Sequence, residues 1–224
     1  MDGVIIDSEP IFFKIEQQMF RELNIEVPFE EHSTYVGTSS QNMWTLITRR
    51  HSVPLGADDL VKREFGLYMD YLQNVDGLRA IDGAVELIQE LTLEKFKVAI
   101  ASSSHMDVID TVIDRFELTS YFMVKVSGSL LTHPKPEPDI FLETARLLEA
   151  APDHCVVIED SHNGVLAARA AGMKCIGFAN PHSGLQDLSA ADIVVSGFRE
   201  LNIDMIRTCG DLARPLKNMN FGPT

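Results

Sequence analysis

The sequence has few of the features that would direct a protein to a membrane or to nucleic acid. No apolar run approaches the roughly 18 residues that a membrane-spanning helix needs. Basic side chains are scarce: 19 lysines and arginines against 33 aspartates and glutamates give a net charge of -14, which would repel a nucleic-acid backbone or an anionic lipid surface. We therefore expect no nucleic-acid partner and no membrane, so that any phosphate must be bound by a local site.

Cysteines are also few. Cys155, Cys175 and Cys209 are odd in number and show no CxxC spacing, and two of them lie within apolar runs. This pattern is typical of buried thiols in a reducing compartment. The chain does not open with a basic segment followed by an apolar stretch, so nothing in it indicates export. These features predict a cytoplasmic protein.

The composition is that of an ordinary globular protein. Of the 224 residues, 45% are hydrophobic and 23% are charged, which excludes a disordered or collagen-like chain. At about 150 residues per domain, the length suits one large domain or a core that carries a smaller one. Such a chain can bury a substantial hydrophobic core.

From Lys97 onward, short β-branched runs alternate with amphipathic segments. The runs predict strands at 97–102, 122–127, 155–160, 174–178 and 192–195. Between them, apolar spacing predicts helices at 106–116, 139–150 and 163–172. Strands separated by such helices form βαβ units, so we expect an α/β fold with a doubly wound parallel sheet covered on both faces.

Residues 9–75 follow a different pattern, because no β-rich run interrupts them and apolar residues recur at spacings of three and four. A helix is expected to begin after Ser8, with Pro10 in its first turn. Further helices are expected at about 40–51 and 57–74, and the segment 85–91 returns to the α/β pattern. We therefore expect an α/β core formed by residues 1–8 and 76–224, into which residues 9–75 insert an all-helical cap.

Short stretches of the chain carry side chains suited to chemistry. The chain opens MDGVIIDSEP, where Asp2 precedes a glycine, although an Asp-Gly pair alone most often marks a turn. Ser102 ends a strand run, at the carboxyl edge where α/β sheets hold ligands, although a serine there more often caps the next helix. Lys135 stands among three prolines in HPKPEPD, which can hold its ammonium group at one point; an exposed lysine in a rigid loop is the equal alternative.

A further stretch, VVIEDSHNG, ends an apolar strand run with the adjacent carboxylates Glu159 and Asp160. Two like charges at the end of a buried strand repel each other and are costly to desolvate unless a cation joins them. Carboxylate oxygens suit Mg²⁺, which keeps waters and substrate phosphate oxygens as further ligands. A carboxylate, a hydroxyl, a lysine and a metal-binding pair at one sheet edge are the groups that phosphoryl transfer needs.

Together these stretches resemble the haloacid dehalogenase-like (HAD) phosphohydrolases, in particular the branch with a helical cap that includes β-phosphoglucomutase and sugar-phosphate phosphatases. The resemblance runs from Met1 to about Ile206, and MDGV supplies all but the first residue of the family's opening motif, D-x-D-G-[TV]. It implies a Mg²⁺-dependent phosphatase that acts on a small phosphorylated metabolite, expected to be a sugar phosphate, through an aspartyl-phosphate intermediate.

The resemblance also implies a role for each candidate residue. Asp2 would be the general acid/base and would offer its main-chain carbonyl to Mg²⁺, and the Lys135–Pro136 bond would be cis. The catalytic residues that it implies are Asp2, Ser102 and Lys135. Those implied for binding the substrate phosphate are Ser102, Ser103 and Lys135, and those for Mg²⁺ are Asp2, Glu159 and Asp160.

One departure from the family's pattern concerns the start of the chain. The family's nucleophile is the first aspartate of D-x-D, which falls one position before Met1, and the preceding strand, central in the family's sheet, falls there too. Without that strand, the runs 97–102 and 155–160 would face each other across an empty lane of unpaired backbone, which a folded domain cannot easily bear. We expect an apolar strand and an aspartate upstream of Met1. The alternative is a truncated chain that binds phosphorylated ligands without catalysis.

A phosphosugar mutase of the β-phosphoglucomutase type is the alternative enzyme. By the resemblance, such a mutase has a cap histidine where this chain has Phe12, and an arginine after a cap glycine where residues 37–41 read GTSSQ. Both differences favour the phosphatase. Dehalogenase chemistry needs no metal, so the candidate metal site argues against it.

Other prominent side chains have structural interpretations. Trp44 and the phenylalanines of the cap are expected in the core. His105, His133 and His162 lie near predicted strand ends, where we expect helix capping or supporting contacts, because Mg²⁺ prefers oxygen ligands.

Overall fold

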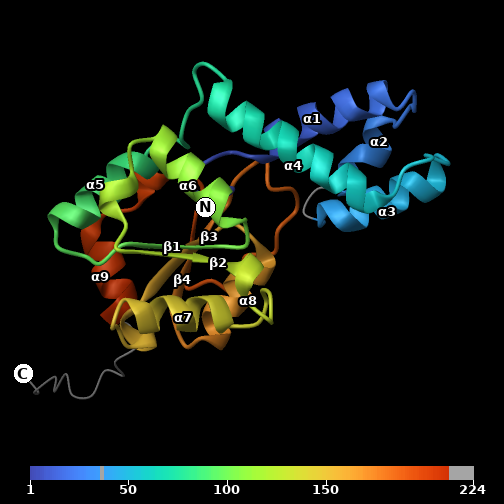
Figure 1. Ribbon diagram of the computed structural model, residues 1–224. Coiled ribbons are helices and arrows are strands. Elements are labelled where there is room, and N and C mark those ends of the chain that lie inside the picture. Colours follow the sequence, from blue (N-terminus) through green and yellow to red (C-terminus); the bar gives the residue numbers. More distant parts are fainter. Residues whose placement is uncertain (36–37, 212–224) are drawn as a thin grey trace, which may run out of the picture.

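The computed structural model describes residues 1–35 and 38–211 (Figure 1). Its α-helices are α1 (Glu9–Glu22), α2 (Phe29–His32), α3 (Ser40–Arg50), α4 (Ala57–Asn74), α5 (Ala84–Leu93), α6 (Met106–Arg115), α7 (Asp139–Leu147), α8 (His162–Ala170) and α9 (Ile203–Asp211). The strands are β1 (Ala99–Ser102), β2 (Val124–Ser127), β3 (Val156–Glu159), β4 (Lys174–Phe178) and β5 (Ile193–Val195). Short 3-10 helices lie at Ser33–Tyr35, Thr119–Tyr121, Gly128–Leu130, Pro152–His154 and Phe198–Glu200.

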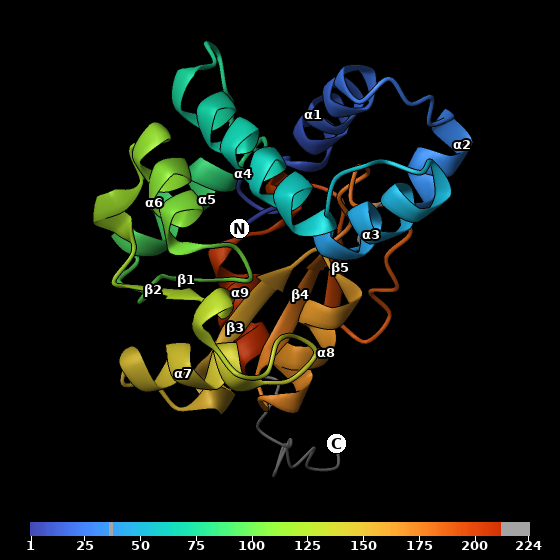
Figure 2. The same ribbon diagram turned by 45° about the vertical axis from the view of Figure 1, so that its right-hand side comes forward.

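Helices α1 to α4 form a block that lies to one side of the strands (Figures 1 and 2). Helix α1 begins after Ser8 with a proline in its first turn, as expected, although the Ser8 side chain makes no capping hydrogen bond. Trp44 and Ile47 of α3 are completely buried, which confirms the core position expected for Trp44. The all-helical character of this segment agrees with an inserted cap, and the domain borders at residues 8 and 76 remain predictions.

The strand ladders are parallel, which confirms the α/β class. Strand β1 pairs with β2, and β4 lies between β3 and β5. Along β4, Ile176 and Phe178 pack in one apolar cluster with residues of α5 and α9. Cys175, on the opposite face, packs with residues of α7 and α8. Helices therefore cover both faces, as the apolar strand runs predicted.

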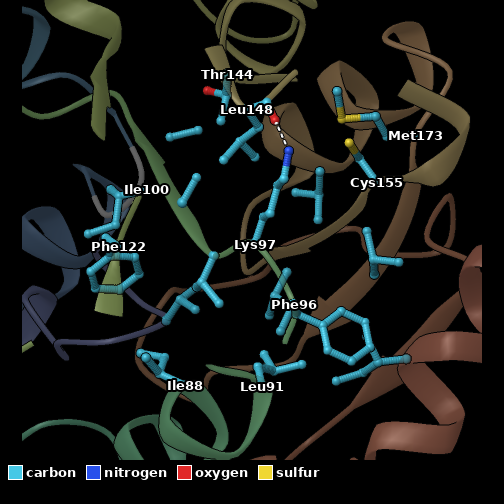
Figure 3. Close-up of a pocket in the computed structure, with 18 of the residues that line it drawn as sticks. Ile88, Leu91, Phe96, Lys97, Ile100, Phe122, Thr144, Leu148, Cys155 and Met173 are labelled. Carbon is cyan, nitrogen blue, oxygen red and sulfur yellow. Dashed lines mark hydrogen bonds between the residues drawn. The ribbon is translucent and has the colours of Figure 1, made fainter. Parts of the chain in front are cut away.

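The sheet is divided in two. Among the described residues, no ladder joins the β1–β2 pair to the β3–β4–β5 sheet. A cavity of about 650 Å³ lies at this division, and both β1 and β3 line it (Figure 3). The parallel strands of the predicted α/β fold are therefore arranged in two ladders with this cavity between them.

The predicted elements differ from the observed ones mainly at their ends. Helix α4 and strand β4 have the predicted bounds, whereas β1 starts two residues later than the run that predicted it. The four-residue helix α2 is too short for apolar periodicity to reveal, and α9 was not predicted. In the described part of the chain, no helix is long and apolar enough to cross a membrane.

Candidate active site

The carboxyl ends of β1 and β3 bring the predicted polar residues together. Ser102 is the last residue of β1 and Glu159 is the last residue of β3. The start of the chain lies between the helical block and these strands (Figures 1 and 2). As a result, Ser102 Oγ lies 3.3 Å from Asp2 Oδ2, although 100 residues separate them in the sequence. The expected convergence of the candidate residues is present in the fold, and the roles assigned to them remain predictions.

Two serine hydroxyls hold the Asp2 carboxylate. Ser104 Oγ donates to Asp2 Oδ2 at 2.6 Å, and Ser102 Oγ donates to the same oxygen at 3.3 Å. Ser102 Oγ also accepts a hydrogen bond from the Ser104 backbone N–H at 3.2 Å, so it orders the turn after β1 rather than capping α6. Ser103 is exposed, and Ser104 is the serine that reaches Asp2. The serine run 102–104 marked this turn in the sequence but did not show which hydroxyl points inward.

Tyr68 of α4 reaches Asp2 from the helical block. Its side chain is 2% exposed, and its ring lies 4.3 Å from the Phe12 ring, centroid to centroid. The buried hydroxyl has no hydrogen-bond partner among the described residues. Burial raises the pKa of Tyr68, and the nearby negative charge of Asp2 raises it further. Tyr68 therefore presents a neutral hydroxyl beside Asp2, at a position where the sequence alone indicates only a core aromatic residue.

Lys135 and Glu159 form a buried ion pair. Lys135 Nζ donates to Glu159 Oε1 and lies 3.5 Å from the carbonyl oxygen of Ala101. Their side chains are only 11% and 8% exposed, so Lys135 is not an exposed loop lysine. The Lys135–Pro136 peptide bond is cis, as the resemblance implied. The lysine charge is thus held at the end of β1, where the sequence placed a phosphate site.

The Glu159 carboxylate is enclosed on several sides. Its Oε2 accepts a hydrogen bond from Ser161 Oγ at 3.0 Å. A Cβ atom on Gly164 would lie 2.1 Å from Glu159 Cδ, so the glycine in the first turn of α8 leaves room for this carboxylate. Burial opposes ionisation of Glu159 most strongly, but the nearby charges of Lys135 and the Met1 amino group outweigh it and hold the pKa of Glu159 below its ordinary range.

Asp160 lies against the start of the chain. Gly3 has a φ of 64°, and a Cβ atom there would lie 1.8 Å from Asp160 Oδ2. Ser183 Oγ donates to the same oxygen at 2.5 Å. Burial raises the pKa of Asp160, and the charge of Glu159 raises it further against the Ser183 hydrogen bond. The glycine of MDGV is therefore required both by its backbone conformation and by the close approach of this carboxylate.

The loop after β4 supplies contacts that were not predicted from the sequence. Ser183 holds Asp160, and Asn180 Nδ2 donates to the carbonyl oxygen of Gly3 at 3.0 Å. Both residues are buried. They follow a parallel strand at its carboxyl end, so the rule that located Ser102 could have located them as well.

The predicted histidine contacts are only partly present. His133 Nδ1 lies 2.9 Å from Asp139 Oδ1 near the start of α7, and His162 Nδ1 lies 2.9 Å from the carbonyl oxygen of Asp187. The His105 side chain makes no capping hydrogen bond at the start of α6, but its ring packs edge-on against the Phe65 ring of α4, with 5.3 Å between the centroids.

Negative charge is concentrated at this edge. Glu9, in the first turn of α1, shows the effect of this charge on a carboxyl group. Burial raises its pKa to about 7, together with the negative charges of Glu16, Asp160, Asp2 and Asp7. A cation bound here would relieve this repulsion.

Asp160 is better placed than Glu159 to bind Mg²⁺. Within residues 1–35 and 38–211, no three histidine, cysteine, aspartate or glutamate side chains converge as a ready-made metal site. Both oxygens of Glu159 accept side-chain hydrogen bonds, whereas among the described residues the Asp160 carboxylate accepts one side-chain hydrogen bond, from Ser183 to Oδ2, beside the Asp2–Gly3 backbone. A carboxylate, a main-chain carbonyl, waters and phosphate oxygens are a set that suits Mg²⁺.

Known proteins share this fold and this sequence pattern. The chain is 33% identical over 178 residues to Protein SUPPRESSOR OF QUENCHING 1, chloroplastic, of Arabidopsis thaliana; the match covers 79% of this chain but only 17% of the plant protein. It is 28% identical over 212 residues to hexitol phosphatase B of Escherichia coli K12, covering 90% of this chain and 91% of that protein. The solved structure of a putative β-phosphoglucomutase from Thermotoga maritima is similar with a TM-score of 0.77 at 25% identity, covering 92% and 95% of the two chains.

A family model described as haloacid dehalogenase-like hydrolase matches residues 1–178. That range contains the helical block, the two half-sheets as far as β4, and every candidate residue predicted from the sequence. Because the match extends over most of the chain and the fold agrees with it, this chain belongs to the haloacid dehalogenase-like hydrolases.

Proposed function

We propose that the chain acts as a phosphatase of a small phosphorylated metabolite, such as a sugar phosphate, with Mg²⁺ and through an aspartyl-phosphate intermediate. The observation that carries the proposal is the meeting of Asp2, Ser102 and the buried Lys135–Glu159 pair where β1 and β3 end. The hexitol phosphatase of E. coli, which matches over nearly the full length of both chains, supports the substrate class.

Ser102 and Lys135 are suited to bind the phosphoryl group. An ammonium group has three donors; Lys135 directs one to Glu159 and lies near the Ala101 carbonyl, which leaves a donor for a phosphate oxygen. The Ser102 hydroxyl can turn from Asp2 to the same group, and the exposed Ser103 hydroxyl lies next to it in the chain. Because Glu159 holds the ammonium in place before substrate arrives, its charge needs little reorganisation during the reaction.

Asp2 is suited to move protons. Its carboxylate is fixed by Ser104 and lies beside the Tyr68 hydroxyl at the boundary with the helical block. In the proposal it protonates the leaving alcohol and later takes a proton from the attacking water. The phosphoryl acceptor is an aspartate attached before Met1, placed on the same side as Asp2 because alternate residues of an extended segment share a face.

Asp160, the main chain of Asp2, and Glu159 are the groups that would hold Mg²⁺. When bound, the ion neutralises charge on the phosphoryl oxygens. Glu159 would reach it only by giving up a bond to Lys135 or Ser161, so we expect Asp160 to be the dominant side-chain ligand. Helices α1 to α4 would exclude water from the site while the leaving group departs.

The test compares chains that carry an apolar strand followed by either aspartate or asparagine before Met1. Each is supplied with Mg²⁺ and a panel of phosphorylated metabolites, and released inorganic phosphate is measured. The aspartate form should hydrolyse a subset, the asparagine form should not, and Asp160→Asn in the active form should raise the Mg²⁺ concentration required. Comparable turnover by the 224-residue chain as it stands would refute the aspartyl-phosphate route.

The same panel separates the two alternatives. A phosphosugar mutase would convert a sugar phosphate into its isomer without releasing phosphate, and product analysis would show this. A binding protein would show a phosphate-dependent increase in melting temperature without turnover.

A further inference from the structure

Helices α1 and α4 border Asp2 from the helical block. Helix α1 follows directly from the start of the chain, and α4 runs beside it (Figure 1). The two helices meet at the rings of Phe12 and Tyr68. Burial raises the pKa of Tyr68, the charges of Asp2 and Glu9 raise it further, and a contact with Ser8 lowers it, so all three lie close to its hydroxyl. Ser8, Glu9, Phe12 and Tyr68 therefore form one surface beside Asp2, which we call the cap surface.

Two hydroxyls of the cap surface have no structural role. The Tyr68 hydroxyl is buried and has no hydrogen-bond partner among the described residues. Ser8 is also buried, yet its side chain makes no capping hydrogen bond at the start of α1. A buried hydroxyl without a partner is costly, and packing alone does not account for it, because phenylalanine would fill the same space. The unpaired Tyr68 hydroxyl therefore indicates a ligand.

The proposed reaction brings the leaving group to these hydroxyls. Asp2 protonates the leaving oxygen, so the two must be in contact. Ser102 and Ser104 reach Asp2 from the turn after β1, whereas the cap surface borders it on the side of the helical block. A leaving group that extends from Asp2 toward the block meets Tyr68. The buried hydroxyl becomes accessible as the block and the strands separate, and it covers the ligand when they close again.

The charge around the cap surface is negative. The pKa of Glu9 is raised to about 7 by burial and by the surrounding carboxylates, so one further negative charge is already unfavourable there. Among the described residues, Lys135 is the only lysine or arginine that pairs with an acid at this edge, and its partner is Glu159. The two charges of a bound Mg²⁺ would be matched by the phosphate dianion. A second anionic group would therefore find no positive charge.

The basic residues of α1 and α4 point away from the cap surface. All of their lysine and arginine side chains are exposed: Lys14, Arg21, Lys62 and Arg63. At 3.6 residues per turn, each lies at least roughly 120° around its helix from Phe12 or Tyr68. Neither helix thus presents a positive charge to the leaving group.

We infer that Tyr68, with Ser8 and Glu9, selects a leaving group that is a polyhydroxy alcohol without negative charge. Tyr68 and Ser8 donate to its hydroxyl oxygens, and Glu9 accepts from a hydroxyl group and repels an anion. Phosphate esters whose leaving group carries a carboxylate or a second phosphate are thereby disfavoured. The inference rests on the proposed phosphatase function, because that reaction is what places the leaving group against Asp2.

Ligand binding tests the inference without any measurement of turnover. Calorimetry with the 224-residue protein and Mg²⁺ at pH 8 compares two matched pairs of esters: glycerol 3-phosphate with 3-phosphoglycerate, and glucitol 6-phosphate with 6-phosphogluconate. Within each pair, a terminal CH₂OH group is replaced by a carboxylate. The member without the carboxylate should bind at least about tenfold more tightly than its acidic partner in at least one pair.

Tyr68→Phe should weaken binding of the preferred ester by about tenfold, whereas inorganic phosphate, which has no leaving group, should bind as before. Tyr71→Phe removes a hydroxyl one turn along α4 and is the matched control, so it should leave both affinities unchanged. Because the Tyr68 hydroxyl has no partner in the described part of the chain, Tyr68→Phe should not lower the melting temperature. A lower melting temperature would show a structural role for the hydroxyl and overturn the inference.

Glu9→Gln tests the charge independently of Tyr68. It should reduce the discrimination against the acidic member of the pair by at least about threefold, and Glu26→Gln, at an exposed position, should not change it. Equal affinity for the two members of both pairs, or an unchanged affinity in Tyr68→Phe, would overturn the inference but not the proposed phosphatase. If neither the esters nor inorganic phosphate bind in the presence of Mg²⁺, both the inference and the proposed function are refuted.

Discussion

Glu64 provides a sharp test of how burial acts in the helical block. Its side chain is 2% exposed, and its Oε1 accepts a hydrogen bond from Trp44 Nε1 at 2.9 Å. Burial, with the nearby Glu16 carboxylate, raises the pKa of Glu64 from 4.5 to about 7, although hydrogen bonds from Ser40 and Trp44 act in the opposite direction. Glu64 is therefore an acid that the folded state prefers to keep neutral.

The direction of the pH dependence follows from this raised pKa. Protonation of Glu64 stabilises the folded state fully below pH 4.5, and this stabilisation is lost as the pH rises to about 7. Glu64→Gln keeps an acceptor for Trp44 but cannot ionise, so it removes the free-energy cost of a buried carboxylate charge. The rise of the Glu64 pKa from 4.5 to about 7 corresponds to about 3 kcal/mol at pH 8, and the stability advantage of the glutamine variant should grow by about 2 kcal/mol between pH 5 and pH 8.

Urea unfolding at pH 5 and pH 8 measures this difference. Glu26, an exposed glutamate of the same block, offers a control: Glu26→Gln should change the free energy of unfolding by less than about 0.5 kcal/mol at either pH. A Glu64→Gln variant that is no more stable than the wild type at pH 8, or whose gain is the same at both pH values, would show that the buried carboxyl carries no such cost.

Three further outcomes follow from the site and the core. Lys135→Met leaves Glu159 buried without its partner and should lower the free energy of unfolding by about 3 kcal/mol. The double variant with Glu159→Gln should recover much of this loss. Urea unfolding that shows no loss in the single variant would contradict the buried pair. Gly164→Ala should cost about 1–3 kcal/mol in thermal unfolding, because the new Cβ overlaps the Glu159 carboxylate; an unchanged melting temperature would contradict that contact. Burial raises the pKa of Cys175 to about 12, so iodoacetamide at pH 8 should label the half-buried Cys155 first. Mass spectrometry of a digest would measure this order, and equal labelling of the two cysteines would contradict the protection of Cys175.

The local features of this protein were predictable from the sequence, because they depend on spacing within a few residues. Apolar residues at helical spacing predicted α6, in which Val108, Ile109, Val112 and Ile113 are buried. The predicted strand runs ended at Ser102 and at the Glu159–Asp160 pair, and this position alone predicted that these side chains would meet at one edge.

The contacts between distant residues were decided by the tertiary structure. Ser104 rather than Ser103 reaches Asp2, because the turn after β1 rotates one hydroxyl inward and the other outward. Tyr68 comes to the same carboxylate from α4, and its position in a helix does not reveal which residue its hydroxyl will lie beside.

The largest difference between the sequence prediction and the structure concerns the carboxylate pair. Adjacent in the sequence, Glu159 and Asp160 point to different partners: the first accepts from Lys135 and Ser161, the second from Ser183 against the Gly3 backbone. Sequence determined that two acids end a buried strand, and hence that positive charge must approach them. Which acid pairs with the lysine and which remains available for a cation depends on the opposite directions that successive strand residues take, and on which loops the fold packs against each side.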